Sequence, residues 1–317
     1  MDKRRLGLIK TLYIIIAAAL VTAGVGAPRL AAEAPMVVAS IPPLHSLTAG
    51  VMEGVGAPAL IIRSAASAHH HVLRPSEARA LHRAEIVIWI GEALEAFLAK
   101  PIKSLAGKAA IVTMLETPGL RLLAPRKGGL WASDGAPLAR RAEPGDADPH
   151  VWLDPENAKI MVGAIGAALA AKDPANGALY GANVRALTRR LDALAAELGA
   201  QLEPVRAVPF LVYHDGFQYF EKRFGLDARG AVASASEQKP GPRRMLRLRA
   251  LIEAGRIGCI FADPGTPASL IHALTGETGV PSAVLDPLGA GLAPGPDLYF
   301  ALMRTNARAF VRCLSGS

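Results

Sequence analysis

The fold is decided by one stretch of the sequence, NGALYGANVRALTRRLDALAAELGAQLEP, which covers residues 176–204. Its leucines recur at spacings of three and four residues, which places them on one face of an α-helix: Leu187, Leu191, Leu194, Leu198 and Leu202. No proline interrupts residues 175–203, and about 27 residues at 1.5 Å each would form a helix ~40 Å long. We therefore expect a single long helix in the middle of the chain.

Short apolar runs alternate with helical patterns on both sides of this stretch. We expect strands before it at 36–40, 59–62, 86–90 and 110–113, and after it at 210–213, 230–233, 258–262 and 282–285. Alternation of this kind is typical of parallel sheets with crossover helices. The sequence therefore predicts an α/β fold of two lobes, each with a mostly parallel sheet and flanking helices, joined by a single long helix.

The composition and these patterns together predict the domain organisation. Hydrophobic residues make up 51% of the 317 residues, which excludes a disordered chain. We expect an N-terminal α/β lobe at 35–174, a linking helix at 175–205 and a C-terminal α/β lobe at 206–317. Residues 124–148 are rich in Gly, Pro, Ala and Arg, and we expect them to form a mobile loop.

The first 34 residues have the features of a secretory signal peptide. Basic residues precede an almost unbroken apolar run at 11–25, and small residues flank a cleavage site at 32–34, with a second candidate site at 25–27. The apolar run is short for a membrane anchor, which needs ~20 residues. No cysteine lies near either site, so a lipid anchor through an N-terminal cysteine is excluded. We expect a periplasmic protein with no stable membrane insertion after cleavage.

A nucleic-acid partner is not expected, although the formal net charge is +8. Outside the signal segment the basic residues are scattered, apart from Arg243, Arg244, Arg247 and Arg249. Arginines at this helical spacing form a solvated face more often than a nucleic-acid surface. No aromatic residues that could stack on bases interleave with them.

Several histidines lie where a parallel α/β fold binds its ligands, beyond the carboxyl ends of strands. The run His69-His70-His71 closes the loop after the expected strand 59–62, and His214 directly follows the strand 210–213. Asp286 follows the strand 282–285, and His150 lies in the segment DPHVWLDP at 148–155. Neutral imidazoles from separate loops with one carboxylate suit Zn²⁺. The remaining histidines are expected to have structural or surface roles: His45, His82 and His272.

The chain resembles the periplasmic zinc-binding components of ABC metal importers. The segments that carry the resemblance occur in the family's order from about residue 36 to the C-terminus: SIPPLHSL at 40–47, HHHVLRPS at 69–76, WIG at 89–91 with LE at 94–95, DPHVWLDP at 148–155, YHD at 213–215, YFEKRFGL at 219–226, FADP at 261–264 and LDPLG at 285–289. Together these segments are specific, whereas each one alone is weak.

The resemblance implies a metal site built from His69, His150 and His214, with Asp286 at the fourth position. In some members water or another carboxylate fills the fourth position instead. Ala68 replaces the family's usual proline, and His71 its aromatic residue, so His70 or His71 could compete with His69 for the metal. Residues 124–148 are the equivalent of the family's His-rich loop, but they contain no histidine. Their composition slightly weakens the case for zinc over manganese as the bound ion.

The two cysteines, Cys259 and Cys313, favour a disulfide over two buried thiols, because an even count in a secreted chain is typical of a bridge. The same pair resembles the bridge of Gram-negative zinc-uptake members. The bond would close a loop of about 54 residues. By restricting the unfolded chain, such a loop would stabilise the fold by roughly 4 kcal/mol.

These features predict a solute-binding protein, not an enzyme. It would capture Zn²⁺ as its transported ligand between the lobes and deliver it, as a monomer, to an ABC transporter membrane permease. The alternatives are a manganese-binding importer component of the same fold, a periplasmic zinc hydrolase and, more weakly, a metal-dependent surface adhesin. A zinc hydrolase needs an open coordination position and a general base, and no His-Glu-x-x-His or Gly-x-Ser-x-Gly motif is present.

Overall fold

The structure is a computed structural model that describes residues 33–63, 71–128, 130–131, 146–233, 241–276 and 278–316. The chain divides into two units, residues 1–33 and 34–317, and the second contains every element described below. The expected signal peptide therefore lies almost wholly outside the described residues. None of the described helices has the length and apolar character needed to cross a membrane.

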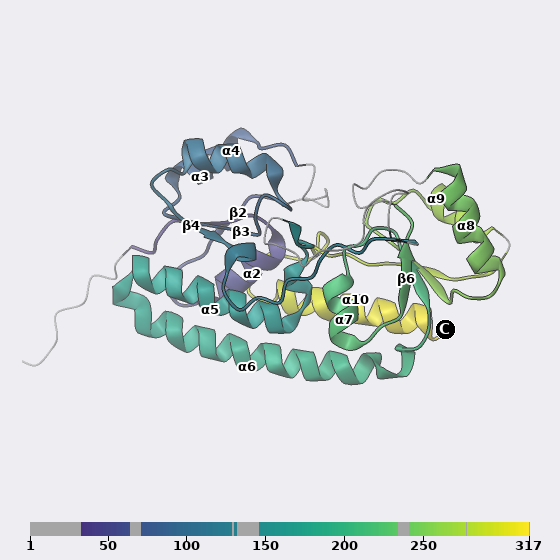
Figure 1. Ribbon diagram of the computed structural model, residues 1–317. Helices are drawn as coiled ribbons and strands as arrows, with labels where there is room; N and C mark the ends of the chain where they lie inside the picture. Colours follow the sequence, from purple (N-terminus) through teal and green to yellow (C-terminus); the bar gives the residue numbers. More distant parts are fainter. Residues whose placement is uncertain are drawn as a thin grey trace, which may run out of the picture. The chain divides into compact units, whose positions relative to one another are not determined.

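The N-terminal lobe is built on a parallel sheet with the strand order β2-β1-β3-β4. Its strands are β1 (Val37–Ala39), β2 (Ala59–Leu60), β3 (Ile86–Trp89) and β4 (Ala110–Thr113). The central strands β1 and β3 are buried along their whole length, as expected for a parallel sheet covered on both faces. Helices α3 (Pro75–Arg83) and α4 (Ala96–Leu105) lie on one face, and α2 (Pro42–Val51) and α5 (Pro155–Lys172) on the other (Figure 1).

The C-terminal lobe repeats this topology, because its parallel sheet has the order β6-β5-β7-β8. Its strands are β5 (Phe210–Val212), β6 (Ala228–Ala231), β7 (Cys259–Ala262) and β8 (Ser282–Val284). Its helices are α7 (Gln218–Phe224), α8 (Pro242–Glu253), α9 (Ala268–Thr275) and α10 (Leu298–Leu314). All strands are parallel, and in both sheets the chain adds strands first to one side and then to the other, so the strand order reverses between the two central strands. The crevice at the carboxyl ends of those strands is where this class of fold binds ligands.

The long helix α6 (Gly177–Leu202) spans both lobes. Its five leucines at helical spacing are all buried, and it packs against α2 and α5 of the N-terminal lobe and against α7 and α10 of the C-terminal lobe. Figure 1 shows it running beneath both sheets. Contact with α2 is close, since a Cβ added at Gly50 would lie 2.9 Å from the Leu187 side chain. The predicted α/β fold of two lobes with a joining helix is confirmed.

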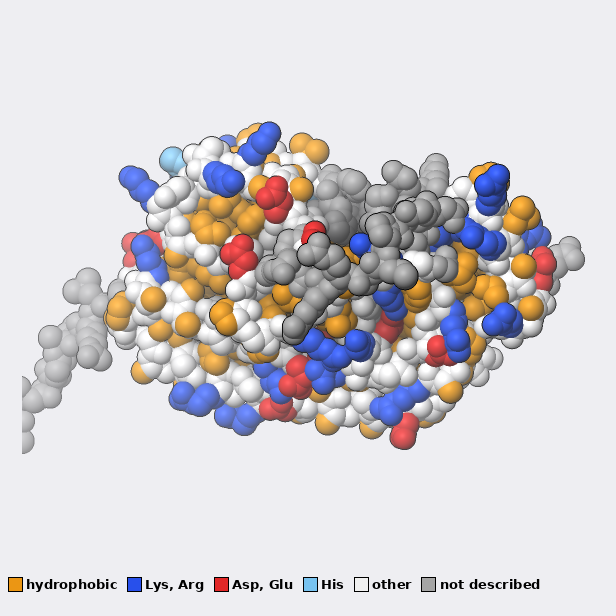
Figure 2. Space-filling view, in the orientation of Figure 1, with side chains coloured by type: hydrophobic (Ala, Val, Ile, Leu, Met, Phe, Trp, Pro, Cys, Tyr) orange, Lys and Arg blue, Asp and Glu red, His pale blue; other side chains and the backbone are white. Residues whose placement is uncertain are grey.

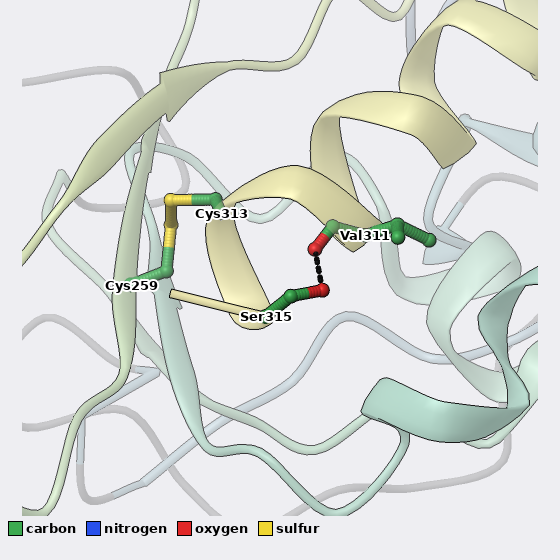
Figure 3. The surroundings of a disulfide bond; sticks show 4 residues. All are labelled: Cys259, Val311, Cys313 and Ser315. Atoms are coloured by element: carbon green, nitrogen blue, oxygen red, sulfur yellow. Dashed lines mark hydrogen bonds between the residues drawn. A yellow bond between two sulfur atoms is a disulfide. The ribbon is translucent and has the colours of Figure 1, made fainter. Parts of the chain in front are cut away.

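Cys259 and Cys313 are bonded as a disulfide, with their Cα atoms 5.9 Å apart (Figure 3). Cys259 begins the central strand β7, and Cys313 lies in the last turn of α10, so the bond ties the C-terminal helix to the middle of the sheet. At the end of this helix the Ser315 hydroxyl donates to the Val311 carbonyl at 2.6 Å. Both cysteines are buried, which fits a bond enclosed by the core.

The edge strand β6 begins two residues earlier than the pattern predicts, at Ala228 and not at residue 230. The apolar run starts only after Arg229, which is exposed because an edge strand is not covered on all sides. Pairing with β5 nevertheless begins at Ala228 opposite Phe210 and shifts register one residue later. Backbone pairing sets this boundary, whereas the side-chain pattern reports only burial.

Candidate metal centre

His214 lies at the carboxyl ends of the two central strands of the C-terminal sheet, where the strand order reverses. It follows β5 closely, and Asp263 follows the neighbouring central strand β7, so the two side chains meet at the carboxyl ends of these strands. The ring Nδ1 of His214 is hydrogen-bonded to the Asp263 carboxylate. The Asp263 backbone N–H donates in turn to the Thr266 hydroxyl at 3.0 Å, which holds the turn after β7.

His150 lies just before α5, the helix that packs on β3 and β4 of the N-terminal lobe. Its backbone N–H and its ring Nδ1 both contact Asp148 Oδ1, at 3.0 and 2.8 Å. Gln218 of α7 donates to the other oxygen of Asp148 at 3.0 Å, and the Tyr219 hydroxyl donates to the Asp148 carbonyl at 2.9 Å. The C-terminal lobe therefore clamps the segment that carries His150.

The Asp148 carboxylate is ionised although it is buried. Burial by itself would raise the pKa of Asp148, but the charge and the hydrogen bonds of His150 outweigh it, together with the bond from Gln218. The pKa of Asp148 consequently lies below its ordinary value. An ionised carboxylate can only accept hydrogen bonds, so the ring of His150 carries its proton on Nδ1 when it is neutral.

The two histidine rings are neighbours, with their centroids 5.4 Å apart, their planes tilted by 56° and both residues buried. Each ring uses Nδ1 for a carboxylate, so Nε2 is the nitrogen that offers a lone pair to a ligand. A carboxylate that orients an imidazole in this way, and raises its basicity, is the usual outer partner of a metal-binding histidine. The pair therefore has the chemistry of two metal ligands, one from each lobe.

The other expected ligands are placed as follows. His69 and its neighbour His70 lie outside the described residues. Asp286 lies after β8, and its oxygens accept backbone N–H groups of Leu288, Gly289 and Ala290 at 2.8–2.9 Å. Within the described ranges, no three His, Cys, Asp or Glu side chains gather as a metal site, so Asp286 does not join the two histidines in such a group.

Hydrogen bonds nevertheless connect the Asp286 loop to the His150 segment. The indole N–H of Trp152 donates to the Pro287 carbonyl at 2.8 Å, and the Tyr299 hydroxyl donates to the Trp152 carbonyl at 2.7 Å. The residue after Asp286 is thus fixed to the second residue after His150. The loops that carry two of the expected ligands belong to one hydrogen-bonded region.

The remaining histidines have structural or surface positions. His71 is buried, with its Nε2 at 2.9 Å from Glu77 and its ring against Phe97, so it helps to hold the start of α3. The ring Nε2 of His45 donates to the Pro58 carbonyl at 3.1 Å, and burial lowers the pKa of His45. His82 and His272 are exposed on α3 and α9.

Sequence reasoning missed the two carboxylates that orient the histidines. Asp263 stands directly after an expected strand, so the rule that selected His214 and Asp286 could have found it. Asp148 lies only two residues before His150, but an aspartate followed by proline is also a common turn element. Only the folded geometry shows that its side chain turns back onto the imidazole.

Basic side chains do not single out a second functional surface on the face drawn in Figure 2. Lys and Arg are spread over both lobes there and alternate with Asp and Glu. Basic side chains of the described residues also make local ion pairs, such as Arg304 with Glu197 at 2.7 Å and Lys159 with Asp192 at 2.6 Å. Paired charges of this kind are typical of a solvated surface.

Comparison with known proteins identifies the family. Residues 37–313 match the model of the family described as "Zinc-uptake complex component A periplasmic". The high-affinity zinc uptake system protein ZnuA of Brucella suis biovar 1 is 37% identical over 332 residues, covering 96% of this chain and 99% of the relative. Two solved structures share the fold. A crystal structure of ZnuA has a TM-score of 0.72 at 23% identity and covers 88% of this chain and 100% of its own. A zinc-bound ZnuA deletion mutant has a TM-score of 0.72 at 21% identity and covers 89% and 98%. The chain therefore belongs to the ZnuA family of periplasmic metal-binding proteins of ABC metal uptake.

Proposed function

We propose that this protein captures Zn²⁺ in the periplasm between its two lobes and delivers it to an ABC-type membrane permease. The proposal rests on two neighbouring imidazoles, His150 and His214. The Nδ1 of each ring is hydrogen-bonded to a buried or half-buried carboxylate. Two oriented Nε2 atoms from different lobes form half of a tetrahedral zinc shell. A relative 37% identical over nearly its whole length bears the name of a high-affinity zinc uptake protein.

His69 is the proposed third ligand and Asp286 the proposed fourth. A carboxylate offers about four lone-pair positions, and the Asp286 oxygens already accept three backbone N–H groups. One position remains for a metal, so Asp286 can contribute a single bond at most. We expect its contribution to the affinity to be smaller than that of either described histidine.

Zinc is cargo in this proposal, and no catalysis is proposed. The domain arrangement that suits this role is an N-terminal lobe at 35–174, a linking helix at 175–205 and a C-terminal lobe at 206–317, after a cleaved signal at 1–34. Because the helix packs on both lobes, large hinge opening would break its contacts. We propose that zinc leaves through movement of the ligand loops, with the protein acting as a monomer on the permease.

Zinc titration against a competing chelator tests the capture step. His150→Ala and His214→Ala should each lower the affinity at least 100-fold, because one oriented ligand is lost while the cores of the lobes are unchanged. His272→Ala is the matched control, since this histidine is exposed on α9. Equal affinity for the unsubstituted protein and His150→Ala would reject the site, and a preference for Mn²⁺ in the same titration would favour the manganese alternative.

Growth under zinc chelation tests the delivery step. A strain that lacks its own copy of this protein should grow when the unsubstituted protein is expressed, and should fail with His150→Ala at equal periplasmic abundance. Rescue by the permease alone, without this protein, would contradict delivery.

A further inference from the structure

A segment between the two sheets reaches from the N-terminal lobe to the edge of the C-terminal lobe. We call residues 121–128 and 130–131 the crossing segment. The Tyr219 hydroxyl accepts from the Leu123 N–H at 2.9 Å, and Gln218 donates to the Ala124 carbonyl at 3.1 Å. Further on, the Ala231 N–H of edge strand β6 donates to the Leu130 carbonyl at 3.1 Å. These described residues are therefore held by the C-terminal lobe, whereas residues 129 and 132–145 of the expected mobile loop at 124–148 lie outside the described residues.

One side chain of the crossing segment binds next to the metal centre. The Arg126 guanidinium donates through Nε to both oxygens of Asp215, at 2.9 and 3.0 Å, and through Nη1 to Glu221 of α7 at 2.6 Å. Its Nη2 also contacts Asp215. The guanidinium carbon lies 3.5 Å from the centre of the Trp131 ring, so the arginine is fixed on its face as well as at its edges.

Both carboxylates depend on this one cation. Glu221 is buried, and burial raises its pKa to about 7 although the charge of Arg126 opposes the change. Its Oε1 has no hydrogen-bond partner in the described part of the chain. Asp215 lies close enough to Glu221 to raise its pKa further. Without the arginine, Glu221 would stay buried as a carboxyl group that has lost its partner, which is unfavourable whether or not it takes up a proton.

We propose that Arg126 is a positioning residue for zinc binding, because its grip on Asp215 fixes the backbone that carries His214. Asp263 orients the ring of His214, while Arg126 holds the next residue of the chain, Asp215. The ring and its backbone are thereby fixed by residues from different parts of the fold. Zinc–nitrogen bonds tolerate only about 0.2 Å of error, so a loosened backbone weakens the site. This inference rests on the proposed zinc-binding function.

The central test separates positioning from stability. Arg126→Met removes the grip on Asp215 and leaves Glu221 without a cation, so both the zinc affinity and the Tm of the metal-free protein should fall. The double variant Arg126→Met/Glu221→Leu also removes the buried carboxyl group that has lost its partner and should recover most of the Tm. It should still bind zinc about tenfold more weakly, because orienting partners of metal ligands contribute about 10- to 100-fold. Arg126→Lys, which keeps one charge but cannot bind both carboxylates as a fork, should give an intermediate affinity.

Arg244→Gln is the matched control for the crossing segment. Arg244 of α8 donates to the Val232 carbonyl at 2.8 Å and also to the carbonyls of Leu130 and Ala231, so it holds the crossing segment through main-chain carbonyls. Its replacement should lower the Tm and leave the zinc affinity within about twofold.

Three results would overturn the inference. They are an unchanged affinity in Arg126→Met, recovery of affinity together with Tm in the double variant, and an equal loss of affinity in Arg244→Gln. The titration of the unsubstituted protein distinguishes this failure from failure of the proposed function. If that protein binds no zinc, the function itself is wrong. If it binds zinc and Arg126→Met binds equally well, only the role of Arg126 is wrong.

Discussion

Gly216→Ala should damage the metal centre through a single added methyl group. Gly216 lies two residues after His214, and its Cα faces the imidazole ring. An added Cβ would lie 2.8 Å from ring Cε1 and 3.2 Å from Cδ2, and closer still to Nε2. Gly216 is not among the glycines with positive φ. Alanine is therefore compatible with its backbone, and the effect is a collision with the ring and not backbone strain.

The size of the effect follows from the contact distances. An ordinary van der Waals contact of a Cβ begins at 3.4 Å, so ring Cε1 must retreat by about 0.6 Å, and Nε2 by more. A metal–ligand distance tolerates about 0.2 Å. A displaced ligand nitrogen should therefore weaken zinc binding by about 10- to 100-fold, which corresponds to about 1.4–2.7 kcal/mol.

Competition titration with a chelator gives the affinity, and two other glycines supply controls. A Cβ added at Gly163 of α5 or Gly199 of α6 meets nothing within 4 Å. Gly163→Ala and Gly199→Ala should leave the affinity unchanged and stabilise the fold by about 0.4–1 kcal/mol each, because alanine restricts the unfolded chain. If Gly216→Ala binds zinc as tightly as these two variants, the placement of the His214 ring at the metal is refuted.

Three further predictions concern the rest of the fold. Reduction of the Cys259–Cys313 disulfide should lower the Tm and decrease the free energy of unfolding by up to about 4 kcal/mol, while the zinc affinity stays unchanged. Two free thiols on labelling the denatured, unreduced protein would disprove the bond. Burial raises the pKa of Glu95 to about 7 from its ordinary value of 4.5. Between pH 4.5 and 7 the folded state therefore keeps a proton on Glu95 that the unfolded state has lost. Stability from this group should therefore fall as pH rises through that range, by at most about 3 kcal/mol. Denaturant unfolding at pH 5 and 7.5 should show the fall, and Glu95→Gln should make it smaller while the contribution of Glu221 stays. Deletion of residues 133–143, which contain no His or Cys, should leave zinc affinity unchanged; a tenfold loss would assign them a role in binding.

The long helix and the positions of the strands could be predicted because they depend on local pattern. The leucine spacing in residues 176–204 predicts a helix that the structure places at Gly177–Leu202. The five leucines that define the spacing, from Leu187 to Leu202, are all buried. Strand β1 likewise lies within the predicted range. Periodicity reports which side of an element is covered, and these elements are covered by neighbours along their whole length.

The outer parts of the site could not be predicted in the same way. Asp148, Asp263 and Arg126 act through contacts with residues distant in sequence, such as the pair Arg126–Asp215, which is separated by 89 positions. No spacing rule relates such residues, because the fold and not the local chain brings them together. His214 could be found because parallel α/β folds bind ligands beyond strand ends, and His150 because its segment DPHVWLDP resembles the family's, but neither signal reveals what the side chain binds. The predicted ligand His69 stays a prediction, since it lies outside the described residues.

The pH dependence of zinc affinity is the most direct test of the proposed site of three histidines. Each imidazole ligand must be neutral to bind the metal, so protons compete with zinc at His69, His150 and His214. At pH values where all three free imidazoles are protonated, the logarithm of the affinity should fall by up to ~3 units per pH unit. Chelator-competition titrations between pH 7.5 and 5, corrected for the pH dependence of the chelator and buffer, should show a slope that steepens beyond one and approaches that limit. A slope that stays at or below one unit per pH unit down to pH 5 would contradict a site built from three histidines.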